Sequence, residues 1–205
     1  MRGMVTGFGG LLVVIGLMAG CSVAAKEPAG VTASPTVIAA SPTATPTPTA
    51  LTGVVMDLSD PALGIVFEKV PDVHGGAADV YNWLATYEKE VWRTLTTNTV
   101  SPGLSILASA EVQATMQQMA TSNAKDQAKV GGVFHATIAD ITVDGDTAHG
   151  TTCDDYRETT FADAKGTYTP KEAGFGEARL SKFTLVRVAA EDRWMIQSQE
   201  WTGPC

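Results

Sequence analysis

A histidine and two neighbouring aspartates have the residue types and spacing that could support general acid–base chemistry. The segments "VFHATIADITV" and "TAHGTTCDDY" flank an Asp-Gly turn at 144–146, a pattern typical of a β-hairpin. A turn of two or three residues sets the register, so His135 is expected to face Asp154 or Asp155. A carboxylate opposite an imidazole could orient that imidazole as a general base.

The period of a strand decides which aspartate shares a face with His135. Cys153 and Asp155 fall on one face of the second strand, whereas Asp154 and Tyr156 fall on the other. Only one acid can share the face of His135, and His135 with Asp155 is the candidate catalytic pair. The competing interpretation is a solvated cross-strand ion pair, which contributes a few tenths of a kcal/mol.

Other signatures of catalysis or cofactor binding are absent from the sequence. No H-x-H or H-x-x-x-H spacing occurs, so a zinc site is not expected. No G-x-S-x-G nucleophile elbow, G-x-G-x-x-G motif or P-loop occurs either. The formal net charge is −8 and no basic patch is visible, which disfavours nucleic-acid binding. The sequence therefore predicts no metal, no cofactor and no nucleic-acid partner.

Cys21 lies at the end of an uncharged apolar run. Residues 4–20 follow Met1-Arg2, as in a secretory signal peptide. The run is too short and glycine-rich for a membrane-spanning helix, which needs about 20 apolar residues. Residues 17–21, "LMAGC", resemble the bacterial lipobox, so we expect 1–20 to be a lipoprotein signal peptide and Cys21 to be lipidated. The alternatives are a spanning helix and an ordinary signal peptide with a stray cysteine.

The other two cysteines, Cys153 and Cys205, are then left as a pair. Exported proteins sit in an oxidising compartment, where such thiols tend to form disulfides. We expect this disulfide to hold the C-terminus, an end that otherwise frays. A catalytic thiol at Cys153 is the alternative.

The segment after Cys21 has the composition of a tether. Residues 21–50 are rich in Pro, Thr, Ala and Ser, and they offer almost no large apolar side chain for a core. We expect a disordered stalk with polyproline II bias. Its threonines could be glycosylated or unmodified, and the sequence leaves both open.

The remaining elements form an order of helices followed by strands. Residues 51–75 are expected to be a lead-in segment, and 76–205 to form one domain. An apolar repeat predicts a helix over 77–97, and Ser109 is expected to cap a second helix. The hairpin described above, a long polar loop over 158–176 and a second hairpin follow. Helices before about four antiparallel strands predict an α+β fold.

This order resembles the NTF2-like (cystatin-like, SnoaL-like) domains of exported lipoproteins from high-GC Gram-positive bacteria. The resemblance lies in "YNWLATYEKEVWRTLTT" at 81–97, "DGDTAHGTTCDDY" at 144–156 and "DRWMIQSQEWTGPC" at 192–205. It implies a curved antiparallel sheet wrapped around N-terminal helices as a cone. Such cones host isomerases, dehydratases and hydrolases in some families and binding or dimerisation surfaces in others, so fold alone does not decide function.

The sequence thus supports two functional hypotheses. The first is a non-catalytic protein, anchored to the membrane by the lipid at Cys21 and exposed on its extracytoplasmic face. Its NTF2-like domain would bind a small apolar ligand or an envelope protein, with homodimerisation left open. The second is a cell-surface SnoaL-like enzyme acting on a small apolar substrate, with His135 and Asp155 as base and orienter.

Overall fold

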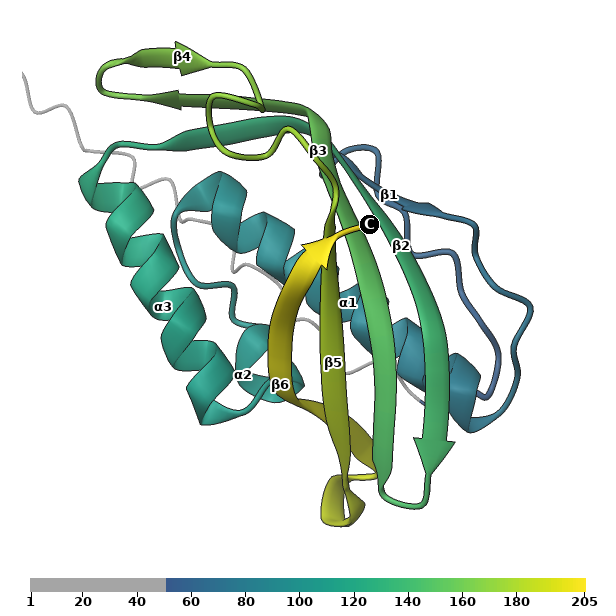
Figure 1. The fold of residues 1–205 in the computed structure, drawn as a ribbon. Coiled ribbons are helices and arrows are strands. Elements are labelled where there is room, and N and C mark those ends of the chain that lie inside the picture. The colour runs from purple at the N-terminus through teal and green to yellow at the C-terminus, as the bar shows by residue number, and fades with distance from the viewer. Residues whose placement is uncertain (1–50) are drawn as a thin grey trace, which may run out of the picture. The chain divides into compact units, whose positions relative to one another are not determined.

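Three helices and six strands make up the part of the chain that the structure describes. The computed structural model describes residues 51–205, so the predicted signal peptide (1–20) and tether (21–50) lie outside it. Figure 1 shows the elements in chain order. They are β1 (Ile65–Glu68), α1 (Gly76–Thr97), α2 (Leu104–Leu107), α3 (Ala110–Lys125), β2 (Lys129–Asp144), β3 (Thr147–Asp163), β4 (Gly166–Tyr168), β5 (Arg179–Val188), the 3-10 turn η1 (Ala189–Glu191) and β6 (Arg193–Pro204).

Helix α1 follows the apolar repeat that predicts it. Val80, Leu84, Tyr87 and Val91 recur every three or four residues, and all four are buried. The helix ends at Thr97, and the next residue, Asn98, has a φ of 54°, the left-handed conformation common after helices. The predicted helix over 77–97 is therefore confirmed to within one residue at its start.

Helix α3 begins at the predicted cap. The Ser109 hydroxyl accepts a hydrogen bond from the Val112 backbone N–H at 3.4 Å, which satisfies one of the free donors of the first turn. The short helix α2 fills the connection between α1 and α3.

The sheet has the order β1-β2-β3-β5-β6, with β4 paired to the far end of β3. The two predicted hairpins, β2–β3 and β5–β6, are both present as antiparallel pairs. In the first, Asp144 pairs with Thr147, so the turn is Gly145-Asp146, and Gly145 takes a positive φ of 57°. Two short strands, β1 and β4, extend the sheet beyond the four strands that the sequence predicts.

The prediction of a long loop over 158–176 is wrong at its start. Strand β3 continues to Asp163, and a tight turn returns the chain as β4. The Asp163 side chain makes this turn, because its Oδ1 accepts hydrogen bonds from the backbone N–H groups of Lys165 at 2.6 Å and Gly166 at 3.2 Å. The irregular segment is thereby shortened to residues 169–178.

The lead-in over 51–75 is part of the fold. Its strand β1 runs parallel to β2, with Ile65 opposite Phe134, so the sheet is mixed rather than purely antiparallel. The α1–α3 segment provides the long crossover that a parallel pair needs. The Asn82 side chain on α1 fixes the preceding segment, since its amide donates to the Val54 carbonyl and its Oδ1 accepts from the Met56 N–H, both at 2.8 Å.

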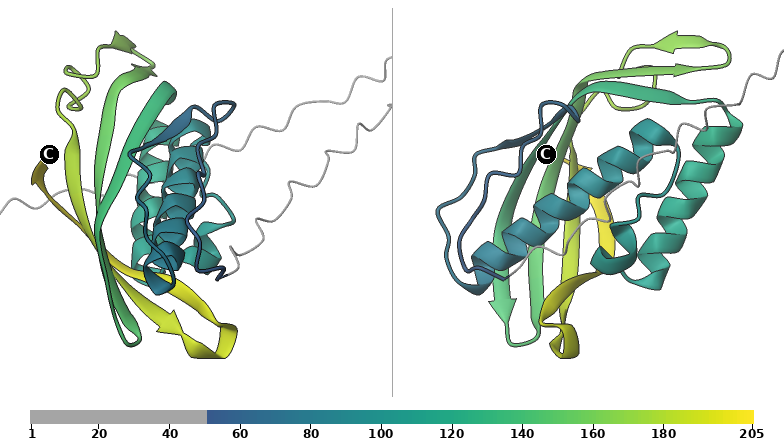
Figure 2. Two further views of the ribbon diagram at one scale, coloured as in Figure 1. Left: turned by 90° about the vertical axis from the view of Figure 1, so that its right-hand side faces the viewer. Right: turned by 180° about the vertical axis from the view of Figure 1, so that it is seen from behind.

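All three helices pack on one face of the sheet, and the sheet curves around them (Figures 1 and 2). The distal halves of β2 and β3 bend over the ends of α1 and α3 (Figure 2, right). The Ala164 N–H donates to the Asp126 carbonyl at 3.4 Å, which joins the sheet to the end of α3. The predicted α+β class is confirmed, and the arrangement is the cone that the NTF2-like resemblance implies.

The core lies between the helices and the concave face of the sheet. Its largest fully buried side chains are Trp83, Trp92, Trp194, Tyr81, Tyr87, Phe134 and Phe183. None of the helices between residues 51 and 205 combines the length and apolarity needed to cross a bilayer.

Candidate functional site

The strand β3 sends its side chains alternately to the two faces of the sheet, as its period predicts. Asp154 and Tyr156 are buried inside the cone, whereas Asp155 is partly exposed on the outer face. Inside and outside therefore carry two separate sets of polar groups.

The interior set is centred on two carboxyl groups, Glu88 of α1 and Asp154 of β3. Both residues are almost completely buried, with 1% and 4% of their surface exposed. Glu88 Oε1 and Asp154 Oδ1 have no hydrogen-bond partner among the described residues. A dehydrated carboxylate without partners is costly, so burial favours the neutral acid.

Burial accordingly raises the pKa of both carboxyl groups. The pKa of Asp154 rises to about 7, although the Thr152 hydroxyl and the charge of Arg179 oppose the rise. The pKa of Glu88 rises well above its usual value, first through burial and then through the charge of Asp154. The pair therefore retains at least one proton near neutral pH.

Two tyrosines accompany this acid pair. The Tyr87 hydroxyl donates to Gln199 Oε1 on β6 at 2.8 Å. Burial, followed by the charges of Glu88 and Asp154, raises the pKa of Tyr87 and Tyr156 well above 10. Both phenols are thus neutral at physiological pH and can act as hydrogen-bond donors.

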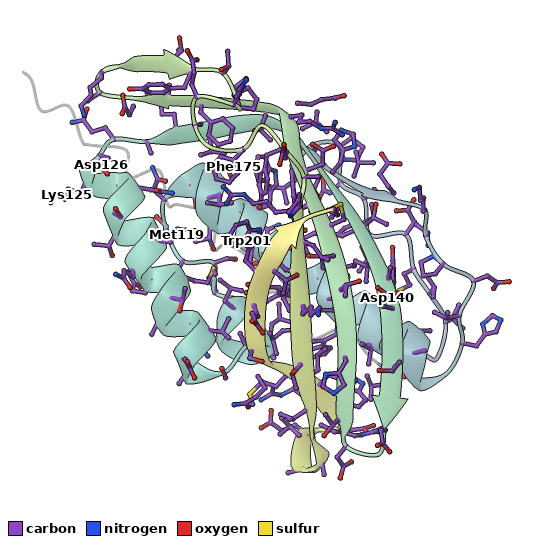
Figure 3. All side chains as sticks on the ribbon, in the orientation of Figure 1. Met119, Lys125, Asp126, Asp140, Phe175 and Trp201 are labelled. Carbon is purple, nitrogen blue, oxygen red and sulfur yellow. A yellow bond between two sulfur atoms is a disulfide. The ribbon has the colours of Figure 1, made fainter. Side chains whose placement is uncertain are left out.

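An apolar pocket of about 230 Å³ lies between the helices and the bent end of the sheet. Figure 3 shows two of its lining side chains, Met119 on α3 and Phe175 in the 169–178 loop. Most of the walls are aliphatic or aromatic. The lining residues are Leu95, Met119, Asn123, Ala128, Lys129, Val130, Tyr156, Phe161, Ala162, Ala173 and Phe175. Such a mainly apolar hollow with a few polar groups is typical of small-molecule sites.

A chain of contacting aromatic rings forms one wall of the pocket and connects it to the core. The Tyr156 ring lies 4.7 Å from that of Phe134 and 4.8 Å from that of Phe175, between ring centroids. Phe175 in turn stacks on Phe161 at 5.0 Å. Tyr156 therefore belongs both to the pocket wall and to the electrostatic surroundings of Asp154.

The outer face holds the predicted catalytic histidine. His135 and Asp155 are opposite each other in the β2–β3 register, so the predicted pairing is confirmed. The two-residue turn alone would give a different register, and a bulge between Ala139 and Thr142 supplies the shift. Asp140 at this bulge has a positive φ of 52°.

The side chains of this outer pair are engaged with other partners. His135 Nδ1 lies 2.9 Å from Glu68 Oε1, and His135 Nε2 lies 3.4 Å from Glu158 Oε2. The Asp155 carboxylate binds the Arg157 guanidinium, whose Nε lies 2.9 Å from Oδ1. Asp155 therefore does not act as the partner that orients His135, and the arrangement does not form the predicted base and orienter.

The surroundings of His135 form an open depression of about 560 Å³ rather than an enclosed cavity. The hydrogen bonds to Glu68 and Glu158 outweigh the opposing effect of burial and raise the pKa of His135. These features match the competing interpretation of a solvated set of cross-strand ion pairs.

The predicted disulfide between Cys153 and Cys205 is confirmed. Cys153 and Cys205 form a disulfide, with their Cα atoms 6.0 Å apart. It joins the terminal residue to the outer face of β3. Cys21 lies outside the described residues, so its predicted lipidation stays a prediction.

Sequence reasoning missed the interior acid Glu88, and the signal for it was present. Leu84, Glu88, Val91 and Leu95 continue one helical stripe at spacings of four and three. An acid at a core position of an apolar stripe indicates a buried carboxyl group. The strand period correctly places Asp154 on the face opposite Asp155, but it does not identify Asp154 as a member of an interior pair.

Comparison with known proteins identifies no family. No family model matches the chain, and no curated protein matches it either. Among solved structures, a calcium/calmodulin-dependent protein kinase type II association domain from Thiobacillus denitrificans is 11% identical, with a TM-score of 0.38 over 60% of this chain and 94% of that one. Bd1075 from Bdellovibrio bacteriovorus is also 11% identical, with a TM-score of 0.35 over 62% of this chain and 41% of that one, so the match spans less than half of Bd1075. The α+β architecture of this chain is defined by its own elements and their register.

Proposed function

We propose that this chain is a lipid-anchored extracytoplasmic protein whose NTF2-like domain binds a small apolar ligand without transforming it. The observation that carries the proposal is the apolar pocket lined by Met119, Tyr156, Phe161 and Phe175. The predicted lipobox at Cys21 and the tether over 21–50 support the location.

The size and lining of the pocket limit the ligand. A hollow of about 230 Å³ suits a compact body of one or two rings rather than a long chain. Aromatic rings on its walls favour stacking or edge contacts with a flat ligand. The polar atoms of Asn123 and Tyr156 could orient one polar substituent.

Naphthalene is a suitable probe, and ¹³C-methyl NMR of Met119 is the readout. We expect naphthalene to shift the Met119 methyl signal, which is assigned with Met119→Leu. Ala173→Phe places a ring in the pocket and should abolish the shift. Ala164→Phe makes the same chemical change on an exposed turn and should leave the shift intact.

An unchanged Met119 signal at saturating naphthalene would contradict the proposal. Equal binding by Ala173→Phe and Ala164→Phe would also contradict it, because the ligand would then lie elsewhere.

One observation favours an enzyme as the second candidate. Tyr156 lines the pocket, and the charge of Asp154, whose pKa burial raises to about 7, acts on Tyr156. A carboxyl group with such a pKa is suited to proton transfer near neutral pH. Under the binding proposal, Asp154→Asn retains naphthalene binding at every pH. Under the enzyme candidate, the residues to test are Tyr156 and Asp154 in place of His135 and Asp155.

A further inference from the structure

A cleft of about 490 Å³, separate from the apolar pocket and from the depression around His135, lies where the 169–178 loop meets the end of β6. Phe175 and Trp201, both labelled in Figure 3, belong to the two segments that border it. Its walls include two cationic side chains, Lys171 and Arg179, and one exposed indole, Trp201. Naphthalene in the apolar pocket would not occupy this cleft, because the two sets of lining residues do not overlap.

Arg179 is held in a fixed position in this cleft. Its Cζ lies 4.0 Å from the centroid of the Phe175 ring and 5.9 Å from that of the Trp201 ring. Its Nη2 donates to the Gly174 carbonyl at 2.7 Å. A guanidinium has five N–H donors, so most of them stay available. Cation–π contacts and one hydrogen bond thus orient the group without neutralising its charge.

No carboxylate within residues 51–205 forms an ion pair with Arg179 or Lys171. Asp154 is opposite Arg179 in the β3–β5 register, but it is buried and its pKa is raised to about 7. Glu177 is the acidic residue among those lining the cleft. The cleft therefore presents two cations against one acid on a chain whose formal net charge is −8.

Trp201 provides a flat apolar surface beside these cations. The residue is 64% exposed, whereas the other three tryptophans, Trp83, Trp92 and Trp194, are at most 1% exposed. An indole this exposed is unusual, because its ring carries a large apolar area. Its side chain can therefore stack on a ring placed in the cleft.

The surrounding backbone is fixed on both sides. The Cys205 N–H donates to the Ala178 carbonyl at 3.1 Å, and the disulfide to Cys153 holds the same residue. In the loop, a Cβ on Gly176 would lie 3.2 Å from the Lys171 Cα and Cβ, so a residue without a side chain allows this close approach. The cleft is thus built from braced segments rather than from free ends.

We propose that this cleft binds a ring-bearing carboxylate, with the ring on Trp201 and the carboxylate on Arg179 and Lys171. A planar guanidinium matches the two oxygens of a carboxylate, and an ammonium adds a second, less directional charge. The ring that stacks on an indole can be aromatic or a sugar. This inference does not depend on the apolar pocket or on the lipid anchor.

The test uses two matched pairs of probes and the four tryptophan indole N–H signals in ¹⁵N NMR spectra. The pairs are 2-naphthoate with 2-naphthamide and glucuronate with glucuronamide, so that each pair differs only in the charged group. We expect the acid of at least one pair to shift the Trp201 indole signal, assigned with Trp201→Leu. The matched amide should bind about tenfold or more weakly, because a charged hydrogen bond is lost.

The naphthoate arm identifies an aromatic acid as the ligand class, and the glucuronate arm identifies an acidic sugar. Arg179→Gln should weaken binding of the effective acid by about tenfold or more, and Lys171→Gln by a smaller factor. Lys171 is exposed, so its variant folds even if the loss of the Arg179–Phe175 contact unfolds the other. Lys165→Gln, on the exposed β3–β4 turn, is the matched control and should leave binding unchanged.

Three results would overturn the proposal. They are the absence of any Trp201 shift with both acids, equal binding of acid and amide in both pairs, and equal loss of binding in Lys171→Gln and Lys165→Gln.

Discussion

A carboxyl group that loses its water needs either a partner or a proton, and the pair Glu88 and Asp154 keeps oxygens without partners. The proton is therefore the means by which the interior tolerates these acids. Outside the cone, the carboxylates of Glu68, Asp155 and Glu158 instead have ionic partners, in His135 or Arg157. The same residue types thus have opposite chemistry on the two faces of β3.

The raised pKa of Asp154 gives a signed prediction for stability against pH. In the unfolded chain its pKa is about 4, whereas burial raises it to about 7 in the folded protein. Between these values the folded state binds more protons than the unfolded state, so stability falls as pH rises. We expect the contribution of Asp154 to the free energy of unfolding to decrease by on the order of a few kcal/mol between about pH 4 and pH 7.

Asp154→Asn removes this titration while keeping the shape of the side chain. Urea denaturation across that pH range should show a shallower decline for Asp154→Asn than for the natural protein, with a relative gain above pH 7. Asp155→Asn is the control, because Arg157 lowers the pKa of Asp155 and this variant should not gain stability at high pH. Parallel curves for the natural protein and Asp154→Asn would show that the interior acid does not titrate on unfolding.

At the scale of elements, the disulfide links the end of the edge strand β6 to β3, which lies two strands away in the sheet. It joins Cys205, after the last strand β6, to Cys153 in β3, across 52 residues of sequence. Opening it should cost about 2–5 kcal/mol of stability, because the unfolded chain gains freedom and the end of β6 loses its anchor. Thermal unfolding of the natural protein with and without reductant, beside the Cys205→Ser variant, measures this cost.

The expected result is a lower midpoint for both the reduced protein and Cys205→Ser, with no further effect of reductant on the variant. Identical midpoints in all three samples would mean that the rest of the β5–β6 pairing already holds the terminus.

Local patterns predict the long elements well and the short ones poorly. The apolar stripe of α1, the Ser109 cap and the Asp-Gly turn each contain their own signal, so these elements are where the sequence predicts them. Strand β1 has four residues and forms only against Phe134 and its neighbours, far along the chain. Strand β4 depends on the side chain of Asp163, within a stretch whose composition suggests a loop. Their pairing is tertiary, and no local period predicts it.

The candidate sites depend on tertiary contacts even more than the short strands β1 and β4 do. The apolar pocket gathers Met119 from α3, Phe161 from β3 and Phe175 from a loop. The cleft joins Arg179 and Trp201, which come close because β5 pairs with β6. Sequence spacing places His135 and Asp155 on facing strands of one hairpin, but their exact pairing also depends on the bulge between Ala139 and Thr142. It does not predict side-chain partners that come from a third strand, such as Glu68.

At the scale of the whole molecule, the proposed location requires a connection between the membrane and the fold over residues 51–205. The proposed anchor is the lipid at Cys21, because residues 17–21 resemble a lipobox. One acyl chain gives marginal binding and a diacylglycerol gives stable anchoring. The tether over 21–50 could then separate the domain from the surface by up to about 90 Å if fully extended.

Metabolic labelling with palmitate tests this anchor in a high-GC Gram-positive host. We expect the natural chain to be labelled and to stay with the membrane fraction, and its processing to be sensitive to globomycin, because lipoprotein signal peptidase cleaves before a lipidated cysteine. Cys21→Ser should lose the label and move to an uncleaved or soluble form. Cys205→Ser is the matched control, since Cys205 is engaged in the disulfide and its loss should leave labelling intact. If Cys21→Ser is labelled as strongly as the natural chain, the lipid is attached elsewhere and the mature chain does not begin at Cys21.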